Sequence, residues 1–285
     1  MTLSLLMADY ASVTWRAASE PHFATVELAT GVTLNYLEQG DPQGEPVILL
    51  HGYTDSWHSF ALILPHFSQE YHVFALDQRG HGDSSKTADS YAMNDFATDV
   101  IAFMDAKGIA QATMVGHSMG SLIALLVAIH HPERVARLVL IDSTNNAGNA
   151  ALVELNTLVQ TMVDPIDPAF VREFQVSTLY GAAPASFMEK VIAESLKAPA
   201  RLWRQALASI IEHNTTADLG KIQAPTLLFW GNQDSLFLRS EQAVLQQLIP
   251  KTTLLIYEET GHALHWEQPE HFAADFEQFL RATQK

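Results

Sequence analysis

Apolar and polar positions along this chain fall into two kinds of block: short apolar runs rich in β-branched residues, and longer stretches with helical spacing. The short runs predict eight strands, near residues 23–28, 32–38, 46–50, 71–76, 112–116, 137–142, 225–230 and 253–258. A short Thr30-Gly31 turn joins the first two runs, so we expect an antiparallel hairpin there. The later runs alternate with helical patterns, which predicts a mostly parallel α/β sheet with helices on both faces.

The segment from about Ser143 to Ile222 breaks this rhythm, because it contains helix-like stretches and no convincing strand. Pro and Gly residues separate its expected helices, which cover residues 150–163, 168–176, 184–196 and 200–213. The sequence therefore predicts a core of residues 23–142 and 223–285 and a helical insertion of residues 143–222. Residues 1–22 form an N-terminal extension of unknown role.

A serine between two glycines occupies the boundary between a strand and a helix, in Gly116-His117-Ser118-Met119-Gly120. The run before it is a short buried strand, and residues 122–129 after it are apolar all round, as expected of a helix packed on a sheet. A turn this sharp brings the residues on either side of the serine into collision unless they are glycine. The pattern predicts a nucleophile elbow, although a Gly-x-Ser-x-Gly turn also arises by chance.

A serine hydroxyl needs a base that is itself oriented by a carboxylate, and the chain supplies a candidate for each. Asp234 follows the strand at 225–230 in a Gly-Asn turn, and His262 follows the strand at 253–258, ahead of an amphipathic helix from about Pro269 to Leu280. Ends of parallel strands share one edge of a sheet, so Ser118, Asp234 and His262 are expected to converge.

Together these motifs resemble the α/β-hydrolase fold, over nearly all of the chain from about Phe23 to Leu280. His51-Gly52-Tyr53, after the third strand, is similar to the family's oxyanion loop, and residues 76–84 resemble its next loop. The resemblance implies that Ser118 is the nucleophile, His262 the general base and acid, and Asp234 its orienting partner. It also implies an oxyanion hole made by the backbone N–H groups of Tyr53 and Met119.

The same resemblance implies that the insertion is a cap over the active-site edge. It leaves a competing acid, Asp142, which also follows a strand. We favour Asp234 because its Gly-x-x-Asp context matches the commoner arrangement in the family.

Several other residues are candidates for substrate contact or for structural roles. His117, Trp57, Phe170, Phe174 and Trp203 are the candidates for the pocket wall. Asp55 precedes a short helical stretch and is interpreted as its N-cap. His51, Asp77, Arg79 and His81 are expected to brace their own loops.

Composition limits the classes of partner and cofactor. The 285 residues are 48% hydrophobic, which is ample for a buried core, and the net charge of −16 disfavours nucleic acid and anionic membranes. The chain has no cysteine, which excludes disulfides and a thiol nucleophile. It lacks a Gly-rich phosphate loop and a His-Glu-x-x-His pair, so we expect neither a cofactor nor a metal. The N-terminal apolar stretch is interrupted by Asp9 and has no preceding Lys or Arg, so we expect no secretory signal and a cytoplasmic protein.

The function that these expectations favour is a serine carboxylesterase, acting through an acyl-enzyme on a small to medium, largely apolar ester. A lactonase would use the same groups. Carbon–carbon bond hydrolases of meta-cleavage products, which often carry Asn where His117 stands, and cofactor-free haloperoxidases or perhydrolases stay open, as does a binding protein without catalysis. Epoxide hydrolases and haloalkane dehalogenases are disfavoured because their nucleophile is Asp. The sequence does not indicate an oligomeric state.

Overall fold

The computed structural model describes residues 21–284, so the predicted N-terminal extension lies almost wholly outside the described residues. The centre of the fold is an eight-stranded sheet of order β1-β2-β4-β3-β5-β6-β7-β8. Its strands are β1 (His22–Glu27), β2 (Thr33–Gly40), β3 (Glu45–Leu50), β4 (Tyr71–Leu76), β5 (Ala112–His117), β6 (Val135–Ile141), β7 (Thr226–Gly231) and β8 (Thr252–Tyr257). Each overlaps the strand expected from the sequence.

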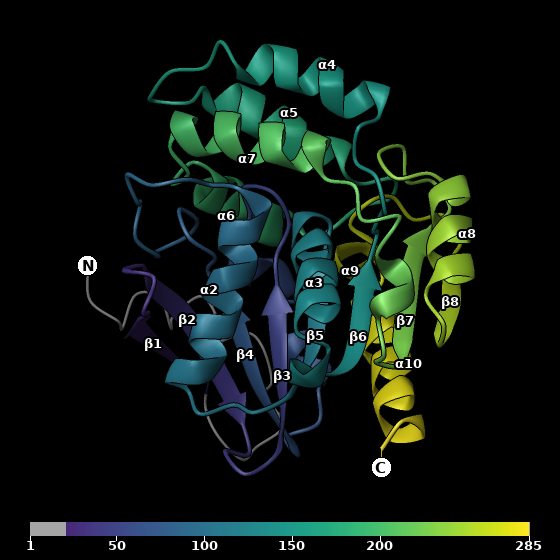
Figure 1. The fold of residues 1–285 in the computed structure, drawn as a ribbon. Helices are drawn as coiled ribbons and strands as arrows, with labels where there is room; N and C mark the ends of the chain where they lie inside the picture. Colours follow the sequence, from purple (N-terminus) through teal and green to yellow (C-terminus); the bar gives the residue numbers. More distant parts are fainter. Residues whose placement is uncertain (1–20, 285) are drawn as a thin grey trace.

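Strand direction follows the expectation of a hairpin and then a parallel sheet. β1 pairs with β2 and β2 with β4 in antiparallel fashion, whereas every pair from β4 to β8 is parallel. Parallel strands that lie side by side end at one edge. The loops after β3, β5, β7 and β8 therefore open on the same side of the molecule (Figure 1).

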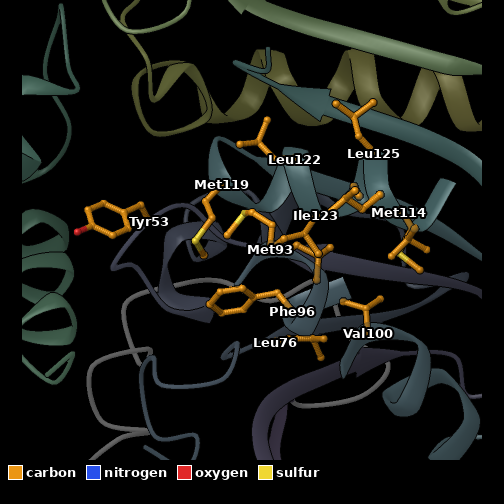
Figure 2. Packing of buried hydrophobic residues seen from close by; sticks show 14 of the residues in the cluster. Tyr53, Leu76, Met93, Phe96, Val100, Met114, Met119, Leu122, Ile123 and Leu125 are labelled. Carbon is orange, nitrogen blue, oxygen red and sulfur yellow. The ribbon is translucent and has the colours of Figure 1, made fainter. Parts of the chain in front are cut away.

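Both faces of the sheet are covered, because successive side chains of a strand point to opposite faces and both sets are apolar. On β3, Ile48 and Leu50 belong to one core cluster and Val47 and Leu49 to the other. α2 (Met93–Ala106), α3 (Met119–His130) and α8 (Arg239–Leu248) contribute to the first cluster, and α10 (Pro269–Ala282) to the second. Figure 2 shows Phe96 and Val100 of α2 lying against α3 in the first cluster.

Four helices are inserted between β6 and β7, and they lie across the end of the sheet at which the parallel strands terminate (Figure 1). They are α4 (Ala150–Val159), α5 (Pro168–Ser177), α6 (Ala185–Ser195) and α7 (Ala200–Glu212). The expected boundaries agree closely except at α4, which ends four residues early. After Val159 the backbone hydrogen bonds run from the Thr161 amide to the Leu158 carbonyl and from the Met162 amide to the Val159 carbonyl, and such tighter bonds are typical of the end of a helix.

Shorter elements complete the fold. α9 (Leu264–Glu267) precedes α10, and four 3-10 turns lie at Trp57–Phe60, Leu64–His66, Pro132–Arg134 and Leu219–Lys221. Among the helices of residues 21–284, none has the length and apolar character needed to cross a membrane.

Candidate active site

Ser118 occupies a strained turn between β5 and α3. Its backbone has φ 50° and ψ −119°, outside the regions that side-chain-bearing residues normally occupy. A Cβ on Gly116 would lie 2.2 Å from the carbonyl oxygen of Gly120, and one on Gly120 would lie 2.0 Å from that of Leu50. Only glycine fits at either position, which is the physical basis of the predicted elbow.

Ser118, His262 and Asp234 form a continuous hydrogen-bonded series. His262 Nδ1 lies 2.9 Å from Asp234 Oδ2, and His262 Nε2 lies 2.8 Å from Ser118 Oγ. Because a carboxylate oxygen can only accept, Nδ1 carries the hydrogen and Nε2 is free to accept from the serine hydroxyl. The ring is therefore held in the tautomer that can take the Ser118 proton.

The backbone around this series fixes both partners of the serine. Asp234 Oδ1 accepts hydrogen bonds from the amides of Leu236 at 2.8 Å and Phe237 at 3.1 Å. The N–H of His262 donates to the carbonyl of Thr178, in the insertion, at 2.8 Å. His262 is thus held to the core through its imidazole and to the insertion through its backbone.

Asp142, the competing acid, takes a different role. It is fully buried with φ 45°, and its Oδ1 accepts from the Gly231 amide at 2.9 Å. Burial, and then the neighbouring Asp234, raise the pKa of its carboxyl well above the usual range. Both ring nitrogens of His262 are already engaged by Ser118 and Asp234, so the geometry favours Asp234 as the acid.

The loop after β3 brings Tyr53 to the cavity in front of Ser118. β3 pairs with β5, with Leu50 opposite Gly116, so this loop and the elbow are neighbours. Tyr53 and Met119 both line the cavity, and Met119 is the first residue of α3, where N–H groups lack intrahelical partners. The Tyr53 hydroxyl donates to the carbonyl of Trp203 at 2.6 Å, which ties the loop to α7.

His51 braces this loop, as expected. Its Nδ1 lies 2.8 Å from the carbonyl oxygen of Gly52, and its Nε2 accepts from the Gln78 amide at 3.1 Å. Burial lowers the pKa of His51 to about 3, so the ring is neutral and donates from Nδ1 alone.

The cavity at Ser118 has a volume of about 40 Å³ and two kinds of wall. The apolar wall comes from α4, α7 and the loop after β7 and includes Leu152, Leu155, Leu207, Ile210, Leu236 and Phe237. The polar wall comes from the β3 loop, the elbow and α5 and includes Asp55, His117, Gln175 and Thr178.

The five candidate pocket residues divide between the cavity and the core. His117 and Phe174 line the cavity. Trp57, Phe170 and Trp203 are not among its lining residues, contrary to expectation. Trp57 packs edge-on against Phe23, with ring centroids 4.9 Å apart, and Trp203 is fully buried against Phe170.

Other roles were misassigned or missed. Ser56, not Asp55, caps the 3-10 turn at Trp57–Phe60, because its side chain accepts from the His58 amide. Asp55 faces the cavity instead. Gln175, which donates to Asp55, and Glu267, which accepts from the Gly181 and Gly261 amides, are not marked by any sequence motif, because their contacts depend on how the insertion docks.

Among residues 21–284, no group of three or more His, Asp or Glu side chains could hold a metal ion.

Comparison of the chain with known proteins identifies its family. The family model described as the alpha/beta hydrolase fold matches residues 45–269. The 2-hydroxymuconate semialdehyde hydrolase of Pseudomonas sp. (strain CF600) is 28% identical, over 90% of this chain and 92% of that protein. The 3-oxoadipate enol-lactonase 2 of Acinetobacter baylyi is 27% identical, over 88% and 94%. The crystal structure of a membrane phospholipase A superposes with a TM-score of 0.83 at 28% identity, covering 98% of this chain and 92% of that one. The chain therefore belongs to the alpha/beta hydrolase fold family.

Proposed function

We propose that this protein is a serine hydrolase that cleaves carboxylic esters through an acyl-enzyme on Ser118. The observation that carries the proposal is the hydrogen-bonded series from Ser118 through His262 to Asp234, with the accepting nitrogen of His262 at 2.8 Å from the serine oxygen. A serine without such a base is a poor nucleophile at neutral pH.

The chemistry follows from the positions of these groups. His262 Nε2 takes the Ser118 proton as the oxygen attacks the ester carbon, and Asp234 stabilises the resulting imidazolium. Negative charge that develops on the ester oxygen is met by the amides of Tyr53 and Met119, and each such donor contributes roughly 3 kcal/mol in well-studied cases. The alcohol leaves with the proton from His262, and water then repeats the sequence to release the acid.

The cavity supports a small to medium substrate with an apolar part. Its volume of about 40 Å³ leaves little room beneath α4 and α7, and leucine and isoleucine side chains form that wall. We infer that residues 143–222 act as a cap that selects the substrate. The likeness to the membrane phospholipase A is consistent with ester chemistry.

Lactonase activity is the second candidate, because ring opening uses the same nucleophile, base and oxyanion donors. The 27% identity to an enol-lactonase over most of both chains favours keeping it. A relative that is 28% identical to this chain is named as a hydrolase of 2-hydroxymuconate semialdehyde, so this compound is included in the substrate panel.

The test combines active-site labelling with a substrate panel. A fluorophosphonate should modify Ser118, and Ser118→Ala should lower kcat for short-chain esters by about 10⁴-fold or more. Ser177→Ala, at an exposed serine of α5, is the matched control and should retain activity. Labelling at another serine, or full activity of Ser118→Ala, would overturn the assignment. Faster opening of lactones than of any ester would favour the second candidate.

A further inference from the structure

A buried carboxyl and a buried imidazole meet in the polar wall of the Ser118 cavity, outside the hydrogen-bonded series. Asp55 is 4% exposed and His117 is 3% exposed. Asp55 Oδ2 lies 3.9 Å from His117 Nδ1, which is too far for a direct hydrogen bond. Both side chains line the cavity.

One nitrogen of the His117 ring, Nδ1, is a hydrogen-bond acceptor in the polar wall of the cavity. The other ring nitrogen, Nε2, lies 2.8 Å from the carbonyl oxygen of His262, and a carbonyl only accepts, so Nε2 carries the hydrogen. Burial lowers the pKa of His117 well below its ordinary value, so Nδ1 is unprotonated. Within the described part of the chain, Nδ1 has no hydrogen-bond partner.

The other carboxylate oxygen of Asp55, Oδ1, already accepts a hydrogen bond from the insertion. Gln175 Nε2 donates to Asp55 Oδ1 at 3.0 Å and to Ser195 Oγ at 2.8 Å, so both hydrogens of that amide nitrogen are used. These bonds hold Asp55 in place and leave Oδ2 turned toward His117. A buried polar atom without a partner is costly, and a ligand atom that satisfies it gains affinity.

One oxygen atom can bridge the two groups, because their 3.9 Å separation is less than twice the length of an ordinary hydrogen bond, about 2.8 Å. We propose that Asp55 and His117 form a subsite that binds a hydroxyl group of the substrate. The preferred substrate is then an ester that carries a free hydroxyl close to the bond that is cleaved. This inference rests on the proposed esterase function and names its substrate class.

A hydroxyl fits this pair better than a cationic amine does. Burial raises the pKa of Asp55 to about 7, so near neutral pH much of the carboxyl is protonated and can donate to the hydroxyl oxygen. The hydroxyl then donates to His117 Nδ1, so the acceptor nitrogen that lacks a partner gains a hydrogen bond. The titratable groups that face Asp55 are His117 and His262, and a bound cation would oppose the imidazolium that His262 forms during catalysis.

The test uses matched esters with the full-length protein. One pair, 2-hydroxyethyl and propyl butanoate, places the hydroxyl on the alcohol side; the other, methyl 3-hydroxybutanoate and methyl butanoate, places it on the acyl side. In at least one of the two pairs, the hydroxylated ester should have a kcat/KM about tenfold higher than that of its matched ester without the hydroxyl. That ratio should fall as pH rises through about 7, because the protonated Asp55 is lost. An effect of pH on the catalytic step itself changes the rates of both esters of a pair and cancels in the ratio.

Two substitutions at Asp55 separate recognition from general damage. Asp55→Asn keeps a donor and should keep the preference while making it independent of pH. Asp55→Leu removes the donor and should bring the ratio close to one. Asp105→Asn, at a carboxylate with 63% of its side chain exposed, is the control and should behave as the wild type does.

The wild-type measurements alone can overturn the proposal, whether or not the variants fold. Equal rates within both pairs would remove the subsite and leave the esterase function standing. A preference for 2-aminoethyl butanoate that grows with pH would show a cation site instead. Failure to hydrolyse any plain ester, with Ser118 unlabelled, would overturn the proposed function itself.

Discussion

Single backbone atoms around the elbow impose a tight steric constraint on the residues that flank Ser118. A side chain on Gly120 would have to displace the Leu50 carbonyl, which belongs to a central strand and has no freedom to move. The positive φ of Ser118 shows that the turn is already held against its preference by the strands and helix around it. Backbone packing, more than side-chain chemistry, therefore decides which residues can flank the serine.

Gly120→Ala is expected to lower the free energy of unfolding by about 3 kcal/mol, because the added methyl group meets the backbone carbonyl of Leu50. Gly220→Ala is its control, since a Cβ there would meet nothing within 4 Å and φ is not in the left-handed region. The control should change stability by less than about 0.5 kcal/mol. Urea denaturation of both proteins measures the difference, and equal stabilities would contradict the steric account.

Substitution of Asp234 and of Asp142, the two carboxylates at the strand ends, is expected to affect kcat differently. Asp234→Asn should lower kcat by about 10⁴-fold, because an amide no longer selects the tautomer with Nδ1 protonated. Asp142→Asn should retain turnover, since Asp142 accepts from the Gly231 amide and not from His262. Ester hydrolysis by the purified variants measures both. Loss of activity in Asp142→Asn alone would return the acid role to Asp142.

The pH dependence of stability gives a second readout for Asp142. Burial raises its folded-state pKa, so the stability that its protonated form contributes is complete below the unfolded pKa and is lost as pH rises through the folded pKa. The stability difference between Asp142→Asn and the wild type should therefore shift in favour of the variant as pH rises above about 4.

The convergence of Ser118, Asp234 and His262 was predictable from the sequence, because local motifs mark each of the three residues. Ser118 is marked by its glycines, and Asp234 and His262 by the ends of their strands. Sequence reasoning misassigned Asp55, whose partner Gln175 lies 120 positions away on α5. Local sequence carries no information on how an inserted helix docks against a distant loop, so contacts of this kind were beyond prediction.

At the scale of elements, the strands were predicted almost completely because their apolar runs are short, continuous and bounded by turns. The helices of the insertion were predicted as elements, but not their attachment to the core. Glu267 of α9 provides part of that attachment. Its carboxylate accepts from the amides of Gly181 at 2.6 Å, Gly261 at 2.8 Å and Tyr180 at 3.3 Å.

Glu267→Ala is expected to loosen the loop that carries His262 together with the α5–α6 connection. Loss of these hydrogen bonds should cost about 2 kcal/mol of stability and lower kcat about tenfold, since the imidazole is held less firmly. Glu189→Ala removes an exposed ion pair with Arg172 on the insertion surface and should change neither. Thermal unfolding and ester kinetics on the two variants measure the effect. Unchanged kcat in Glu267→Ala would show that the loop is held by other contacts.

At the scale of the whole molecule, charge is distributed far from balance. The chain carries 32 acidic and 16 basic side chains, and its net charge of −16 produces a negative potential that extends into the solvent. An anionic ester is depleted near such a surface, whereas a neutral ester is not affected.

Salt shortens the distance over which this field acts from about 30 Å at 0.01 M to about 8 Å at 0.15 M. The kcat/KM for an ester with a free carboxylate should therefore rise several-fold over this range, while that of a neutral ester of equal length stays constant. Steady-state kinetics at several salt concentrations measure both, and an anionic ester that reacts more slowly at higher salt would indicate a local positive site that overrides the net charge.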